Sequence, residues 1–299
     1  MARGALRLGT FATDLLPRAV EYALLLPDAP AADGRLPVLY FLHGGGGSRD
    51  FLVNTRGLID SAWERGTLRP CVVATVSAGR SFYMDYRDGS ERWESLLAGP
   101  FLEHVREVAN ATSGRRSTAI CGISMGGMGG LRLAFRHPSV FGAVAALEPG
   151  IEPVLAFADI ETRDRFWRDQ SLFERIYGTP VDEQYWAASN PAAIATRQPD
   201  SLRDLAIYLE AGDADSFGLH RGTEFLHRVL FDAEISHEYR LVRGADHVGV
   251  TLGPRFADAL DFVGAVFDPP PVDDTLGPLH AMVARLKERA GLRAADTGT

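Results

Sequence analysis

The sequence predicts an α/β fold with a mostly parallel central sheet and helices on both faces. Short apolar runs, typical of buried strands, alternate with segments whose apolar residues recur at helical spacing. Several of these runs lead directly into turns rich in glycine or carboxylate residues, as expected where parallel strands end at a ligand-binding edge. The chain of 299 residues, with 46% hydrophobic content, can bury one substantial core.

The expected elements follow in order along the chain. Residues 5–11 and 19–26 are predicted to form an antiparallel hairpin at one edge of the sheet. The later strands are expected at 36–42, 70–77, 117–121, 140–147, 205–209 and 238–242. The helices are expected at 51–64, 93–109, 125–137, 222–231 and 255–266.

Two regions depart from this alternation. The strand pattern stops over about 148–203, where aromatic and arginine residues interleave, and a mostly helical insertion over the carboxyl end of the sheet is expected there. The body is predicted to span 1–268. Residues 269–299 begin with three prolines and continue into one amphipathic helix and a polar tail. That helix would pack on the body or on a second subunit, giving a homo-oligomer.

Composition limits the kinds of partner. A formal charge of −8 provides no electrostatic footprint for nucleic acid or for an anionic membrane. No apolar run is long enough to span a bilayer, and the first 13 residues lack the apolar core of a signal peptide. We therefore expect a cytoplasmic location and a small-molecule substrate.

Cysteine and histidine usage gives no sign of a metal or cofactor. Cys71 and Cys121 both lie in apolar runs and are interpreted as small core residues. The eight histidines show no metal-ligand spacing. The sequence therefore predicts no metal and no cofactor.

The most informative stretch is Gly122-Ile123-Ser124-Met125-Gly126. It follows an apolar run and precedes a segment with helical spacing, which is the setting of a nucleophile elbow. Four glycines in the first turns of that helix together cost about 4 kcal/mol of helix propensity. Close approach of the helix to neighbouring strands explains such a cost. The alternative is an ordinary helix on which Ser124 is only the N-cap.

A second glycine-rich stretch, residues 43–47, follows the strand expected at 36–42. Such a turn lets the backbone point an N–H group at a developing oxyanion. One donor would come from Gly45 or Gly46, and the other from Met125, directly after the serine. The alternatives are a flexible loop or a phosphate-binding loop, although no phosphate-binding motif accompanies the glycines.

A serine nucleophile needs a base and an acid in later loops. His247 lies in the loop after the strand expected at 238–242 and is the candidate base. Glu210, Asp213 and Asp215 all lie at or beyond the end of an earlier strand. Asp215 is preferred because it lies further into the loop. Asp246 adjoins the histidine and is interpreted as a solvated carboxylate.

Candidate substrate-pocket residues come from two aromatic segments. Tyr83 and Asp85 lie in the long loop at 78–99, and Trp167 and Trp186 lie in the insertion. The alternative is that the insertion's aromatic residues only pack it onto the body.

These motifs together resemble the esterase D family of α/β-hydrolases, which includes S-formylglutathione hydrolases, feruloyl esterases and mycolyltransferases. The resemblance covers about 37–266 and rests on five segments: 42–47, 82–86, 122–127, 212–215 and 244–247. It implies an α/β-hydrolase fold with Ser124 as nucleophile, Asp215 as acid and His247 as base. Ile123 stands where family members commonly have histidine, so no single branch is assigned.

The sequence therefore predicts a serine carboxylic-ester hydrolase that acts through an acyl-enzyme on a small or medium acyl or aryl ester. An acyltransferase or a thioesterase would use the same three residues. A non-catalytic scaffold with a hydrolase-like fold is the remaining alternative.

Overall fold

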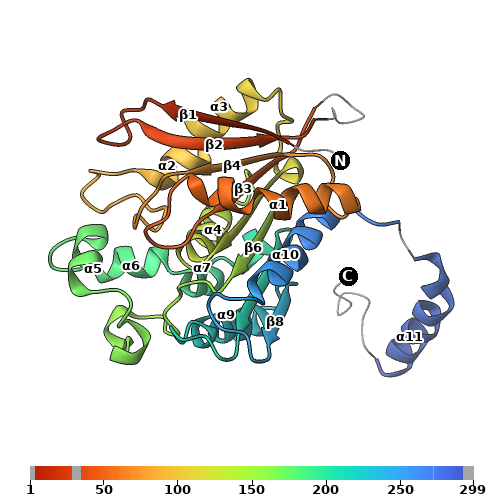
Figure 1. Cartoon of the computed structure of the whole chain (residues 1–299). Coiled ribbons are helices and arrows are strands. Elements are labelled where there is room, and N and C mark those ends of the chain that lie inside the picture. Colours follow the sequence, from red (N-terminus) through yellow and green to blue (C-terminus); the bar gives the residue numbers. More distant parts are fainter. Residues whose placement is uncertain (1–3, 29–34, 272, 292–299) are drawn as a thin grey trace. The chain divides into compact units, whose positions relative to one another are not determined.

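The structure, a computed structural model, describes residues 4–28, 35–271 and 273–291. Within these ranges the strands form one eight-stranded sheet in the order β1-β2-β4-β3-β5-β6-β7-β8 (Figure 1). The strands are β1 (Ala5–Phe11), β2 (Val20–Leu26), β3 (Val38–Leu42), β4 (Val72–Val76), β5 (Thr118–Ile123), β6 (Ala143–Leu147), β7 (Ala206–Gly212) and β8 (Glu238–Val242).

Only β2 runs against its neighbours within the body of the sheet. It pairs antiparallel with both β1 and β4, and every pair from β4 to β8 is parallel. The hairpin at 5–11 and 20–26 therefore forms one edge of the sheet, as the sequence predicted. The strands from β3 to β7 are buried almost throughout, because helices cover both faces.

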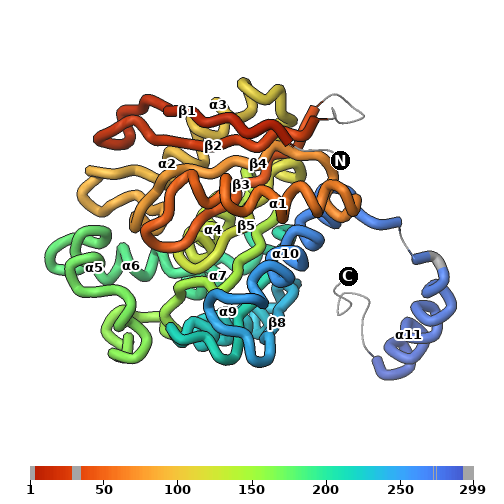
Figure 2. Tube along the Cα trace, in the orientation of Figure 1, coloured from red at the N-terminus to blue at the C-terminus, as the bar shows by residue number. Residues whose placement is uncertain are grey.

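The side chains of each strand alternate between two hydrophobic cores. In β3, Leu39 and Phe41 pack against α1 (Asp50–Arg65) and α10 (Leu252–Phe267). Val38, Tyr40 and Leu42 belong to the core on the opposite face. The helices that contribute to that second core include α2 (Trp93–Ala98), α3 (Pro100–Val108), α4 (Met125–Arg136), α7 (Pro191–Arg197) and α9 (His220–Asp232). Figure 2 shows the same layers along the Cα trace.

One expected helix is divided. The apolar spacing predicts a single helix at 93–109, but α2 ends at Ala98 and α3 begins at Pro100. Proline removes a backbone donor and disfavours helical geometry in the residue before it, and Gly99 accordingly leaves the helical region with φ −125° and ψ −112°. The Gly99-Pro100 pair was the signal that the prediction overlooked.

The insertion after β6 is helical, and its helices α5 and α6 lie beyond the end of the sheet where the parallel strands finish (Figure 1). Its elements are η2 (Phe157–Asp159), η3 (Thr162–Asp164), α5 (Gln170–Tyr177), α6 (Glu183–Ser189), α7, and α8 (Pro199–Leu202). Side-chain oxygens of Asp169, Asp182 and Asn190 cap α5, α6 and α7. These caps set the short helices whose start the sequence pattern did not locate.

The chain divides into two compact units, Met1–Asp268 and Pro269–Thr299. In the second unit, α11 (Gly277–Arg289) exposes an apolar face, and the predicted tail at 292–299 lies outside the described residues. That face consists of Leu279, Met282, Val283 and Leu286. Self-association through α11 stays a prediction. Of the helices described, none is both long and apolar enough to cross a membrane.

Candidate active site

Ser124 lies at the turn between β5 and α4, with φ 57° and ψ −118°. A positive φ is rare for a residue with a side chain and indicates backbone strain held by the surroundings. The Ser124 N–H donates to the Leu147 carbonyl at 2.8 Å, and the Ser124 carbonyl accepts from the Gly150 N–H at 3.2 Å. These bonds fix the serine between β5 and the chain that follows β6.

The glycines around Ser124 allow close packing of backbones. A Cβ on Gly122 would lie 2.4 Å from the Gly126 carbonyl oxygen, and a Cβ on Gly126 would lie 2.3 Å from the Leu42 carbonyl oxygen. No Cβ fits at such distances, so the turn from β5 into α4 requires glycine at both positions. This is the close approach that the loss of helix propensity implied.

The glycine loop after β3 lies next to the serine. A Cβ on Gly44 would lie 3.4 Å from the Ser124 Cβ. The Gly46 N–H donates to the Gly79 carbonyl at 2.8 Å, whereas the Gly45 N–H has no acceptor among the described residues. The Met125 N–H opens α4, where the first N–H groups lack partners within the helix. Gly45 and Met125 are thus the available donors, and Gly46 is committed elsewhere.

His43 supports this loop from beneath. Its ring is buried, its Nδ1 lies 2.6 Å from the Gly44 carbonyl oxygen, and its Nε2 accepts from the Ala78 N–H at 3.1 Å. Burial lowers the pKa of His43, so the ring is neutral and Nδ1 carries the proton. The Tyr83 hydroxyl donates to the His43 carbonyl at 3.1 Å. The sequence analysis did not assign His43 this role.

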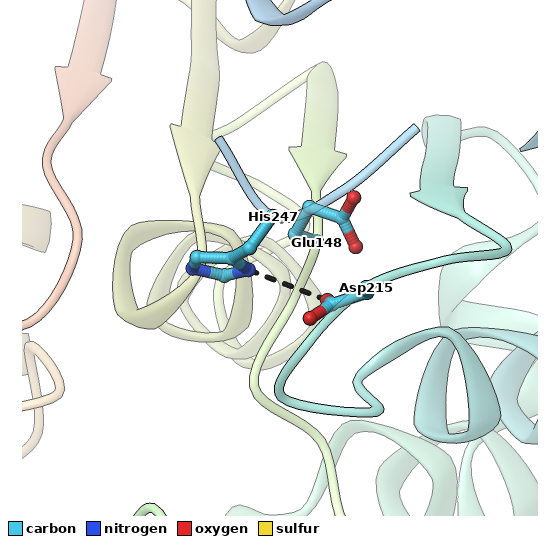
Figure 3. Close-up of side chains that lie close together, drawn as sticks. All are labelled: Glu148, Asp215 and His247. Atoms are coloured by element: carbon cyan, nitrogen blue, oxygen red, sulfur yellow. Dashed lines mark hydrogen bonds and ion pairs between the residues drawn. The ribbon is translucent and has the colours of Figure 1, made fainter. Parts of the chain in front are cut away.

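The candidate acid and base meet at the other end of the site. His247 Nδ1 lies 3.3 Å from Asp215 Oδ2 (Figure 3). The Asp215 side chain is fully buried and its other oxygen accepts from the Phe217 N–H at 2.6 Å. Burial opposes ionisation of Asp215, but hydrogen bonds with His247, Glu148 and Phe217 outweigh it and lower the pKa of Asp215. Asp215 is therefore an ionised acceptor for the imidazole.

Phe217 and Phe166 connect the imidazole to the insertion. The Phe217 ring meets the His247 ring edge-on, with 4.7 Å between centroids. Phe166, from the insertion, stacks on Phe217 with centroids 6.3 Å apart and planes 9° apart. Both phenylalanines are largely exposed, so this aromatic row lies at the molecular surface beside the base.

Two further aspartates join the acid loop (213–217) to the base loop (243–247). Asp213 accepts from the Gly244 N–H at 2.6 Å. Asp246 accepts from the Ser216 N–H and hydroxyl and from the His247 N–H. These bonds lower the pKa of Asp246 to about 2. The expectation of a merely solvated Asp246 is corrected: it remains exposed, but it holds the two loops together.

Glu148 is a second carboxyl group beside Asp215 (Figure 3), and it was not among the residues predicted from the sequence. It follows β6 directly, its side chain is fully buried, and Gly212 donates its N–H to Oε1 at 2.7 Å. Arg255 of α10 also binds Oε1. Burial, together with a hydrogen bond to Asp215 and the charge of Asp215, raises the pKa of Glu148 to about 8. The available signal was a carboxylate at the end of a strand beside β5.

Ser124 and His247 both follow carboxyl ends of parallel strands, β5 and β8. No hydrogen bond joins Ser124 Oγ to the His247 ring among the described residues. In unliganded sites such bonds are often long and tighten when substrate binds.

The four predicted pocket residues have different surroundings. Tyr83 is buried behind His43, and Trp186 is buried against Phe157 within the insertion, so neither presents a surface to a substrate. Asp85 accepts from the backbone and hydroxyl of Ser95 in the first turn of α2. The contacts of these three residues are structural, and a substrate-binding role for them stays a prediction.

Trp167 is the pocket candidate that stays close to the nucleophile. A Cβ on Gly150 would lie 3.3 Å from the Trp167 ring, and Gly150 is bonded to Ser124. Trp167 also stacks on Phe82, with centroids 6.4 Å apart. A surface hollow lined by Ala206 and Glu238 lies instead at the start of β7 and β8, the opposite end of the sheet.

Glu148, Asp215 and His247 are also the one group of at least three potential metal ligands found among the described residues. Their ligand atoms lie within 4.8 Å of one another. Asp215 and His247 already share a hydrogen bond, and Arg255 binds Glu148. These contacts suit a hydrogen-bonded acid and base, and the prediction of no metal stays a prediction.

Comparison with known proteins supplies the decisive observation: the Esterase family, described as "Putative esterase", matches residues 13–251. The chain belongs to the esterase family. An esterase of Mycobacterium tuberculosis is 26% identical over 202 residues, covering 63% of this chain and 42% of the relative. The chain thus matches less than half the length of that relative. S-formylglutathione hydrolase of Bos taurus is 23% identical, covering 80% of this chain and 86% of the relative.

The architecture of this esterase-family chain is the α/β-hydrolase fold. A solved ferulic acid esterase superposes with a TM-score of 0.73 at 21% identity, covering 89% of this chain and 100% of the esterase. The mostly parallel sheet, with helices on both faces, agrees with that superposition. The predicted family resemblance and the predicted fold are confirmed.

Proposed function

We propose that this chain is a serine carboxylic-ester hydrolase. The observation that carries the proposal is the strained Ser124 turn at the same sheet edge as the bonded Asp215 and His247 side chains. A serine hydroxyl becomes an effective nucleophile when an imidazole oriented by a carboxylate removes its proton. Asp215 accepts a hydrogen bond from the Nδ1–H group of His247, which leaves Nε2 unprotonated and free to act as the base.

The reaction proceeds in two steps. Ser124 Oγ attacks the ester carbonyl as His247 takes its proton, and the N–H groups of Gly45 and Met125 stabilise the oxyanion. The protonated imidazole then gives that proton to the departing alcohol. Water, activated by the same imidazole, releases the acid from Ser124. Loss of one oxyanion donor costs about 3 to 4 kcal/mol of transition-state stabilisation.

The decisive experiment combines labelling with turnover. A fluorophosphonate probe should add one adduct at Ser124, located by mass spectrometry, and p-nitrophenyl acetate should be hydrolysed. Ser124→Ala should lose both, whereas Ser216→Ala, a surface serine of the acid loop, should keep the label. Full turnover by Ser124→Ala would disprove the assignment, and an unlabelled wild-type chain would favour a non-catalytic scaffold.

A thioester is the second candidate substrate, because a relative at 23% identity is named S-formylglutathione hydrolase. The ferulic acid esterase superposition favours small acyl or aryl esters instead. A panel of p-nitrophenyl esters of increasing length, a feruloyl ester and S-formylglutathione separates these classes by kcat/KM. Adding alcohol acceptors and analysing the products tests acyl transfer.

A further inference from the structure

Glu148 occupies a costly position for an ordinary structural residue. It lies between the nucleophile strand and the acid strand, its side chain is fully buried, and its φ is 44°. A buried carboxyl group and a positive φ at a residue with a side chain both oppose folding. Its backbone N–H donates to the Glu210 carbonyl at 2.8 Å, which fixes the residue at the sheet edge.

The two oxygens of Glu148 have unequal surroundings. Oε1 accepts from the Gly212 N–H at 2.7 Å and from Arg255. Oε2 is buried and receives no donor from the described residues. The nearby polar group is the Asp215 carboxyl, and both groups lie with His247 inside a 4.8 Å cluster. Two ionised carboxylates this close together repel, and a proton on one of them relieves that repulsion.

We propose that Glu148 is a positioning residue for the esterase reaction, using its own carboxyl proton to hold the Asp215 carboxylate toward His247. The inference rests on the proposed function of Ser124 and His247. Asp215 already accepts from the Phe217 N–H and from the His247 ring, which favours its ionised form. The proton therefore resides on Glu148, whose Oε2 becomes a donor.

The charged groups packed around Glu148 agree with this assignment. Arg255, from α10, also binds Glu210 of β7, with Nε 2.7 Å from Glu210 Oε1. One guanidinium thus faces two buried glutamates, and Asp215 and His247 complete the set from the acid and base loops. A single cation shared with Glu210 does not compensate ionised Glu148 and Asp215 together. A neutral Glu148 relieves the excess negative charge.

The arrangement connects each loop to the sheet. Arg255 also donates to the Asp246 carbonyl at 2.8 Å, so the residue before the base is bound to the same cation as Glu148. Gly212, which binds Oε1, is the last residue of β7 and precedes the acid loop. Glu148 consequently holds both the acid side chain and the strand end that carries it.

Three variants distinguish hydrogen-bond donation by Glu148 to Asp215 from the structural contacts of Glu148 Oε1 with Gly212 and Arg255. Glu148→Gln keeps the shape and donates an N–H to Asp215 at every pH. Glu148→Leu removes the donor and the Oε1 contacts together. Glu210→Gln is the matched control, since Glu210 also binds Arg255 but makes no hydrogen bond to Asp215 among the described residues. Turnover of a p-nitrophenyl ester from pH 6 to pH 9.5 and thermal unfolding are measured for each.

We expect Glu148→Leu to lower kcat by about 10-fold or more with little change in KM, the equivalent of one hydrogen bond to a charged group. Glu148→Gln should stay within about threefold of wild type near neutrality. Above pH 8 wild type should lose activity that Glu148→Gln retains, because only the glutamate ionises there. Coincident pH profiles for the two proteins, or unchanged kcat in Glu148→Leu, would overturn the proposal.

Infrared difference titration gives a readout independent of catalysis. A protonated carboxylic acid should show its carbonyl band near neutrality and lose it with a midpoint of about 8. Glu148→Gln should lack that band, and Glu210→Gln should keep it. If no band distinguishes wild type from Glu148→Gln, Glu148 is ionised and the inference fails, even with Ser124 fully active. Conversely, an unreactive Ser124 with the band present refutes only the esterase proposal.

Discussion

The nucleophile turn and the acid-base loops reach the same sheet edge by different means. Ser124 is placed by backbone alone, since neighbouring glycines let β5, α4 and the chain after β6 approach within direct contact. The base loop is placed by side chains: Asp213, Asp246 and Arg255 join it to the acid loop and to α10. The first arrangement tolerates no added atom, whereas the second depends on charge and therefore on pH.

The strongest test of this comparison removes the base. His247→Ala should lower kcat/KM for a p-nitrophenyl ester by about 10⁴-fold or more, because Ser124 then lacks a proton acceptor. His237→Ala is the control. His237 directly precedes β8, at the opposite end of that strand from His247, so this variant should retain activity. A loss below about 10-fold in His247→Ala would show that another group serves as base.

The Ser124 turn, which backbone contacts position, is tested most directly by a substitution at Gly126. A Cβ there would lie 2.3 Å from the Leu42 carbonyl oxygen and 2.7 Å from that of His43. Gly126→Ala should destabilise the fold by about 1–3 kcal/mol in urea unfolding, because rigid backbone must shift. Leu42 and His43 lead into the glycine loop after β3, so the shift should also move the proposed oxyanion donor Gly45, and activity should fall.

Gly57 provides the matched control for that substitution. It lies within α1, and a Cβ there would meet nothing within 4 Å. Gly57→Ala should stabilise the protein by up to about 1 kcal/mol through helix propensity. If Gly126→Ala behaved like Gly57→Ala, the claim that the elbow requires glycine would be wrong.

The acid and base loops, which side chains hold together, should lose less activity when one of their contacts is removed. Asp246→Ala removes the acceptor for Ser216 and for the His247 N–H. We expect kcat to fall by about three- to tenfold as the base loop loses its fixed position, with a small effect on thermal stability. Exposed Asp232→Ala is the control. Equal kcat values for the two variants would show that Asp246 does not position the base loop.

A further expected effect is a pH-dependent slope in stability. Glu148 has a pKa raised from 4.5 to about 8, so the folded state holds a proton that the unfolded chain releases between these values. The contribution is complete below pH 4.5 and is lost as pH rises toward 8. Glu148→Gln should flatten this part of the thermal unfolding profile. A parallel slope in both proteins would place the proton elsewhere.

The local pattern of the sequence was sufficient for the nucleophile turn and most of the sheet. A strand, a Gly-x-Ser-x-Gly turn and a helix are contiguous in the chain, and buried parallel strands are continuous apolar runs. Glu210, the alternative to Asp215, lies inside β7 and binds Arg255, whereas Asp215 is bonded to His247. For the turn and the strands, residues that are close in sequence determine the local geometry.

The remaining interactions depend on residues far apart in sequence. Glu148 and Arg255 are separated by 107 positions, and nothing in the spacing of either predicts that they meet. Tyr83 and Trp186 resembled pocket residues by type, yet tertiary packing buries both. Gly99-Pro100 was a local signal that was overlooked, since the apolar spacing continues across it. Apolar periodicity locates elements but does not identify which polar groups their ends bring together.

The row formed by Phe166, Phe217 and His247 has a consequence for work on chimaeras. Phe166 comes from the insertion, so grafting residues 148–203 from a relative replaces the ring that stacks on Phe217, which in turn contacts the proposed base His247. If the proposed esterase reaction is correct, we expect such an exchange to change its rate together with its choice of ester. We expect a graft to change substrate preference without changing the rate only if it keeps an aromatic residue at position 166.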